Sequence, residues 1–201
     1  MLAGKQGKGL SRDMKELLET QVDWREVLRS FVNDTCIGTD YATYDRPDRR
    51  YLSEGFIMPS GVSEQVGVMA LHLDMSGSIG GRVQQIMISE VVELAKTANP
   101  PELHIIYWDT DVQRAEVYKR DEYDTIISKT KPTGGGGTDV RCVPQYLKEH
   151  NIKPQASIVL TDGYLYGGWG VWEHPVLWCV LDNKSATPDV GQVVHIKSTE
   201  I

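Results

Sequence analysis

Three short segments of the sequence carry oxygen-bearing side chains that could share one ligand. The candidates are Asp74, Ser76, Ser78, Thr138 and Asp162. The two serines and the threonine offer neutral hydroxyl oxygens, and the two aspartates offer carboxylates. Mg²⁺ prefers about six oxygen ligands in near-octahedral geometry and keeps several of its waters. The set therefore predicts a site for one hard divalent cation, Mg²⁺ or Mn²⁺.

The spacing of the first segment supports a shared ligand. Asp74, Ser76 and Ser78 are two residues apart, so an extended chain directs their side chains to the same side. Gly77 lets the backbone turn without a side chain in the way.

Alternating strands and helices are expected to position these segments. Apolar runs predict strands over 67–74, 102–108, 112–118, 156–160, 176–181 and 192–196, and helical periodicity predicts helices over 82–98, 121–128 and 144–150. Asp109 and Asp111 fit a hairpin turn, which makes 112–118 an antiparallel edge strand. The alternation predicts an α/β fold, a mostly parallel sheet with helices on both faces. Ligands of such sheets bind beyond the carboxyl ends of the strands, where the strand order reverses, and the three segments fall at such ends.

The first sixty residues differ in sequence pattern from the rest of the chain. We predict a helical N-terminal extension and linker over 1–60 and a metal-binding domain over 61–201. Short helices are predicted over Ser11–Leu18 and Trp24–Val32, the second after a capping box that begins at Asp23. The apolar face of the second helix consists of Trp24, Val27, Leu28 and Phe31. We expect this face to pack on the chain's own main domain.

Taken together, the three segments resemble the metal-ion-dependent adhesion site (MIDAS) of von Willebrand factor A (VWA) domains. That site combines Asp-x-Ser-x-Ser, a threonine in a Gly-Gly-Thr loop, and Thr-Asp-Gly after an apolar strand. The resemblance implies a VWA, Rossmann-like fold. It also implies that Ser76, Ser78 and Thr138 contact the metal directly. Asp74 and Asp162 would bind it directly or through water.

A closer resemblance is to bacterial and phage VWA-like proteins in which a helical, metallopeptidase-like domain precedes the VWA-like domain. It rests on Asp23-Trp24-Arg25, the stretch from Arg46 to Tyr51, Met58-Pro59-Ser60 and the Gly-Gly-Gly-Gly-Thr-Asp loop. The VWA resemblance itself covers about Gly67–Ile196. The sequence contains no His-Glu-x-x-His. The resemblance therefore implies the C-terminal part of such a protein, with part of the linker.

The resemblance implies a divalent-metal-dependent protein-binding module. Hydroxyl ligands leave the cation electron-poor, so an open coordination position favours an exposed Asp or Glu of a partner protein. The alternative is a non-catalytic regulatory or substrate-handling domain of a metallopeptidase-like or AAA+ ATPase-linked system. A MoxR-type AAA+ ATPase is then the candidate partner. A purely structural metal site is a third interpretation.

Catalytic functions are not favoured, and no catalytic residue is predicted. Asp74 occupies the position where a nucleophile elbow needs glycine before Ser76, and no Gly-Lys-Ser/Thr follows the glycine-rich loop. A phosphatase with an aspartate nucleophile would, by family resemblance, have Asp at position 76. His72 and His104 fall inside predicted strands, where packing roles are expected.

The composition limits the classes of partner and the cellular location that we expect. The formal net charge of −7 argues against a general nucleic-acid binder. No apolar run approaches the roughly 20 residues of a membrane-spanning helix, and the first nine residues have no signal-peptide core. Three cysteines without a CxxC pair favour a reduced, cytoplasmic location.

Two features remain open at this stage. Asp139 could approach the metal or cap the following helix, and we favour the cap. The glycine-rich stretch Gly167–Trp172 could tuck its tryptophans against the core, or form an aromatic rim that grips a partner.

Overall fold

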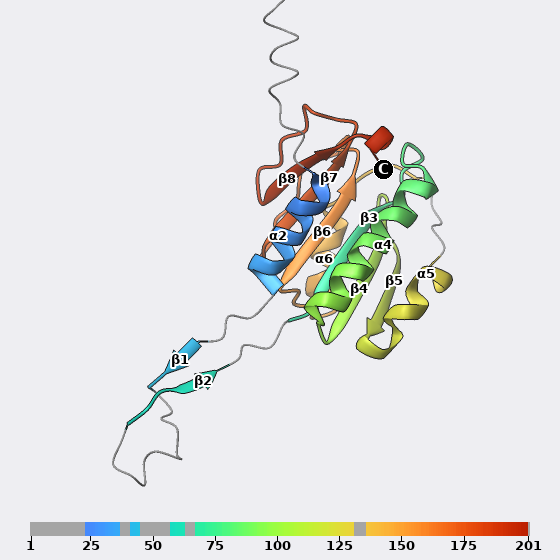
Figure 1. The fold of residues 1–201 in the computed structure, drawn as a ribbon. Helices are drawn as coiled ribbons and strands as arrows, with labels where there is room; N and C mark the ends of the chain where they lie inside the picture. Colours follow the sequence, from blue (N-terminus) through green and yellow to red (C-terminus); the bar gives the residue numbers. More distant parts are fainter. Residues whose placement is uncertain (1–22, 37–40, 45–56, 63–66, 131–135, 201) are drawn as a thin grey trace, which may run out of the picture.

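The computed structural model describes residues 23–36, 41–44, 57–62, 67–130 and 136–200. A central sheet carries helices on both faces, and a small two-stranded sheet lies apart from it (Figure 1). The predicted helix Ser11–Leu18 lies outside the described residues. None of the helices in the described ranges is long and apolar enough to cross a membrane.

The central sheet has six strands in the order β5-β4-β3-β6-β7-β8. Their bounds are β3 Met69–Asp74, β4 Glu102–Trp108, β5 Val112–Lys119, β6 Ala156–Thr161, β7 Val176–Leu181 and β8 Gln192–Ile196. All neighbours are parallel except β4 and β5, which pair antiparallel. The predicted α/β fold with one antiparallel edge strand is therefore confirmed.

Burial explains why the inner strands are mostly apolar. Every residue of β3, β6 and β7 is buried, whereas the edge strand β5 is mostly partly or fully exposed. Parallel strands need crossover connections, and these place helices on both faces of the sheet. Helix α4 (Gly81–Ala98) covers one face and α6 (Cys142–Glu149) covers the other (Figure 1).

The helices begin and end close to the predicted positions. Helix α4 ends where Asn99 adopts a left-handed conformation with a φ of 53°. Pro144 lies in the first turn of α6, where its missing N–H costs no hydrogen bond. The short helix predicted after β5 is a 3-10 turn, η1 (Arg120–Thr125), followed by α5 (Ile126–Lys129). A final 3-10 turn, η2, spans Ser198–Glu200.

Helix α2 (Trp24–Cys36) packs on the main domain as predicted. It lies against α4, β6 and β8 (Figure 1). The side chains of Trp24, Leu28 and Phe31 are buried in the core cluster on the α4 face of the sheet. Nε of Arg25 donates to Oε1 of Glu90 on α4 at 2.7 Å.

The small sheet does not follow from the sequence pattern. Strand β1 (Tyr41–Thr43) pairs antiparallel with β2 (Ser60–Val62). Each strand has only three residues, which is too short to show the alternation that identifies a strand.

Candidate metal centre

The predicted site residues gather where the strand order reverses. From β3 the chain passes through α4 to β4 on one side, and it later returns to β6 on the other side. Asp74 is the last residue of β3, and Asp162 directly follows β6. The two aspartates therefore end neighbouring parallel strands at one edge of the sheet, which is the expected ligand position for this topology.

Asp74 is held rigidly beneath the surface. Its side chain is completely buried. Oδ1 accepts the backbone N–H of Ser76 at 2.8 Å, and Oδ2 accepts the hydroxyl of Thr161 at 2.8 Å. The amide of Gln84, on the first turn of α4, donates to the backbone carbonyl of Asp74 at 2.9 Å. These bonds fix both the carboxylate and the loop that follows it.

The two serines connect this buried carboxylate to Asp162. The hydroxyl oxygens of Ser76 and Ser78 are 3.1 Å apart, and Ser78 donates to Oδ2 of Asp162 at 2.5 Å. The other oxygen of Asp162 accepts the backbone N–H of Tyr164 at 3.1 Å. Asn183 donates to the backbone carbonyl of Asp162 at 3.0 Å. Four of the five predicted residues thus form one chain of hydrogen bonds.

Thr138 lies on the neighbouring loop and is positioned by its backbone. Its carbonyl accepts the N–H of Tyr166 at 2.8 Å, which joins the Thr138 loop to the segment that follows Asp162. The next N–H, of Asp139, donates to the carbonyl of Asp109 at 2.7 Å. Within the described residues the hydroxyl of Thr138 has no hydrogen-bond partner, in contrast to the hydroxyls of Ser76 and Ser78.

Asp139 has a local structural role. Oδ1 accepts the backbone N–H of Arg141 at 3.1 Å and its Nε at 2.8 Å, and Oδ2 accepts Nη2 of Arg141 at 2.6 Å. Both carboxylate oxygens are therefore engaged just before α6. The N-cap of α6 is Arg141 and no side chain caps the helix, so Asp139 closes a turn ahead of α6 and the favoured capping role is not found.

Several residues that hold the site were not identified from the sequence. Thr161 was visible only as part of Thr-Asp-Gly, and its role in orienting Asp74 depends on the pairing of β3 with β6. Gln84, Asn183 and Arg141 reach the site from positions with no motif of their own. Their roles depend on the fold, so no local pattern could have revealed them.

Comparison with known proteins decides the family. Residues 69–197, more than half of the chain, match the family described as "VWA-like domain (DUF2201)". The chain belongs to this family. Residues 2–65 match the family described as "Putative metallopeptidase domain". Both matches confirm the resemblance to VWA-like proteins in which a metallopeptidase-like domain precedes the VWA-like domain.

One relative is a protein of Thermotoga maritima. It is 29% identical over 157 residues, which are 78% of this chain and 37% of the relative. The chain thus spans little more than a third of that relative's length.

The donor set of this VWA-like domain fits a hard cation. Within the described ranges, no group of three or more His, Cys, Asp or Glu side chains could hold a metal ion. A cation at this site would depend on the serine and threonine hydroxyls together with Asp74 and Asp162. Such an all-oxygen set suits Mg²⁺ or Mn²⁺ better than Zn²⁺, which prefers nitrogen and sulfur ligands.

The segment after Asp162 resolves the open question about the aromatic loop. Trp172 is buried in the core cluster on the α6 face, and partly buried Trp169 packs against this cluster. The exposed side chains are instead Tyr164, Tyr166 and Val171, at 72%, 78% and 83% exposure. We call these three residues the rim. The tryptophans therefore tuck against the core, and two tyrosines form the exposed aromatic surface.

A glycine and an arginine hold the rim in place. Gly167 has a φ of 83°, and a Cβ at this position would lie 2.3 Å from the guanidinium carbon of Arg141. Glycine adopts this left-handed backbone conformation without the strain that a Cβ would bring. The guanidinium of Arg141 lies 6.0 Å from the centroid of the Tyr166 ring. The residue that engages Asp139 thus also supports the rim.

The pH dependence of stability provides a test of the buried carboxylate. Burial raises the pKa of Asp74 from 3.8 to about 6, although hydrogen bonds from Ser76 and Thr161 oppose this shift. A pKa raised by folding means that stability is highest below the unfolded pKa and falls as pH rises through the folded pKa. In EDTA we expect the free energy of unfolding to fall by up to about 3 kcal/mol between about pH 4 and pH 7.

Urea titrations across this pH range would measure the effect. The variant Asp74→Asn should lack this part of the pH dependence, because its amide cannot ionise. An identical pH profile in the wild type and in Asp74→Asn would contradict the assignment of the raised pKa to Asp74.

Proposed function

We propose that this VWA-like domain is a divalent-metal-dependent protein-binding module. The observation that carries the proposal is the chain of hydrogen bonds from Asp74 through Ser76 and Ser78 to Asp162. The hydroxyl of Thr138, on the neighbouring loop, has no hydrogen-bond partner among the described residues. Mg²⁺ or Mn²⁺ held there would keep a coordination position for an Asp or Glu of a partner protein.

The exposure of the site residues would let a partner protein reach the cation from solvent. Asp74 is buried and Ser76 nearly so, whereas Ser78 is exposed and Thr138 and Asp162 are half-buried. A cation would therefore have the buried residues Asp74 and Ser76 on its protein side, and it would be open to solvent on the side of the rim. Tyrosine is enriched at protein interfaces, because its ring gives contact area at low entropic cost. The rim would contact partner residues beside the captured carboxylate.

A second candidate is a non-catalytic regulatory or substrate-handling domain of a metallopeptidase-like or AAA+ ATPase-linked system. It is favoured by one observation, the match of residues 2–65 to the putative metallopeptidase family, because α2 of that segment packs on the VWA-like core. The same metal centre would then bind a carboxylate of a MoxR-type AAA+ ATPase or of a substrate. We propose no catalytic role for the chain itself, because its motifs contain neither a nucleophile with a base nor a phosphate loop.

Affinity capture with the full chain as bait would test the function. Proteins from a lysate of the source cells should be retained in Mg²⁺ and released by EDTA. The variant Thr138→Ala should lose them, and Thr110→Ala should keep them, because exposed Thr110 lies on the adjacent hairpin turn outside the metal set. Casein hydrolysis and ATP turnover by the purified chain should remain at background.

Two results would contradict this function. The first is a set of captured proteins that is the same in Mg²⁺ and in EDTA. The second is reproducible turnover that disappears in Asp74→Asn, which would make the metal centre catalytic.

A further inference from the structure

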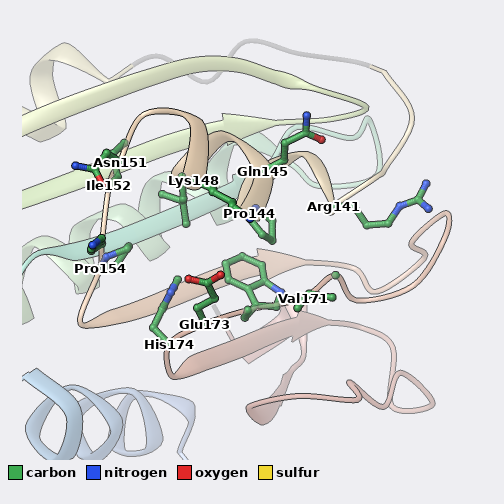
Figure 2. Close-up of a pocket in the computed structure, with 14 residues that line it drawn as sticks. Arg141, Pro144, Gln145, Lys148, Asn151, Ile152, Pro154, Val171, Glu173 and His174 are labelled. Atoms are coloured by element: carbon green, nitrogen blue, oxygen red, sulfur yellow. The ribbon is translucent and has the colours of Figure 1, made fainter.

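A separate cavity lies on the α6 face of the sheet. It is formed between α6 and the segment that leads into β7, and its volume is about 580 Å³ (Figure 2). Pro144, Ile152 and Trp172 supply apolar wall, and Lys148, Lys153 and His174 supply polar groups. Cavities of roughly 300–1,000 Å³ with apolar walls and a few polar groups are typical of small-molecule sites.

A buried chain of hydrogen bonds ends at this cavity. His174, which lines the cavity, is joined through its Nε2 to the hydroxyl of Ser157 at 2.6 Å. The same hydroxyl lies 2.9 Å from Nε2 of His72. His72 and Ser157 are completely buried, and Nδ1 of His72 has no partner. Nδ1 of His174 has no partner among the described residues, and it is not enclosed as that of His72 is.

The chain determines which nitrogen of His174 carries a proton. Burial lowers the pKa of His72 to about 3, so this ring is neutral and has a single N–H. A buried N–H without an acceptor is rarer in proteins than an under-satisfied acceptor. We therefore assign the proton of His72 to Nε2, from which it is donated to Ser157. Ser157 then donates its own proton to Nε2 of His174, which leaves the His174 proton on Nδ1.

The charges around the cavity favour an anion. Lys148 and Lys153 form no ion pair within the part of the chain that the structure describes, and Arg141 at one end is paired with Asp139. Glu173 also lines the cavity and is exposed, as both lysines are, so its negative charge offsets one of their two positive charges. The unpaired lining charge is therefore positive, in a chain whose formal net charge is −7.

We propose that this cavity binds a small organic anion, a carboxylate attached to an apolar body. The carboxylate accepts hydrogen bonds from Nδ1–H of His174 and from the ammonium group of Lys148, which come from opposite sides of the cavity (Figure 2). The apolar body lies against Trp172 and Ile152. The ligand head then accepts from two donors, and the net positive charge of the lining favours an anion over a cation.

Calorimetry with a matched pair of probes tests the ligand class. Naphthalene-2-acetate should bind the full chain saturably, and its neutral amide should bind at least about tenfold more weakly, as expected when a charge-assisted hydrogen bond is lost. Lys148→Glu should weaken binding of the acetate by a similar factor. Gln145→Trp should block this binding by filling the cavity from α6. Lys129→Glu, an exposed lysine on α5, is the control and should bind as the wild type does.

Any of three results would overturn the proposal: no saturable binding of the acetate, equal binding of acid and amide, or unchanged binding in both cavity variants. Imidazole nitrogen NMR tests the donor separately. It should show His174 protonated on Nδ1 and His72 on Nε2. The reverse pair of tautomers would make His174 an acceptor and contradict the assigned site.

Discussion

A chain that begins at residue 61 should melt on the order of 10 °C below the full chain. Trp24, Leu28, Phe31 and Val32 are at most 3% exposed, and burial of each contributes roughly 1.5–3 kcal/mol. Ordering the helix offsets part of this gain, so a net loss of several kcal/mol remains. In a domain of this size each kcal/mol corresponds to about 2–4 °C.

Point variants separate packing from the effect of truncation. Leu28→Ala leaves a cavity at a completely buried position and should cost about 2–5 kcal/mol. Arg29→Ala, at the neighbouring exposed position, should be close to neutral. Calorimetric melting of both variants beside the truncated chain would check these values. A truncated chain that melts with the wild type would show that α2 does not stabilise the VWA-like core.

The main elements were predictable because the sheet is buried on both faces. Residues 69–74, 156–161 and 176–181 are mostly apolar without the alternation of a half-exposed strand, and such runs identify inner parallel strands. The hairpin that makes β5 an edge strand followed from Asp109 and Asp111 at its turn. The packing of α2 followed from its apolar face, since so many large side chains have to be buried somewhere.

The site was predictable only in part. Asp74, Ser76, Ser78 and Asp162 meet because motifs at strand ends converge in a parallel sheet. The hydrogen bonds from Gln84 and Asn183 depend on how α4 and the segment after β7 pack, and no local pattern encodes that. The buried chain of hydrogen bonds through His72, Ser157 and His174 could not be predicted for the same reason. His72 was expected to be a packing residue and is indeed buried, but its partners come from a distant strand and loop.

Loss of metal binding is the largest functional effect that we expect. Thr138→Ala removes a half-buried hydroxyl that makes no other hydrogen bond within the described residues, so the fold should be unaffected. Asp74→Asn removes the carboxylate charge beneath the site and keeps one oxygen acceptor for its neighbours. Because Mg²⁺ binds through charge and exact oxygen placement, either change should abolish a weak site. Thr110→Ala serves as the matched control.

Isothermal calorimetry with Mg²⁺ and Mn²⁺ tests the central claim most directly. The wild type and Thr110→Ala should each show one site. Thr138→Ala and Asp74→Asn should show none, with native circular dichroism. Wild-type metal binding in both of these variants would contradict the assignment of the metal centre to Asp74, Ser76, Ser78, Thr138 and Asp162.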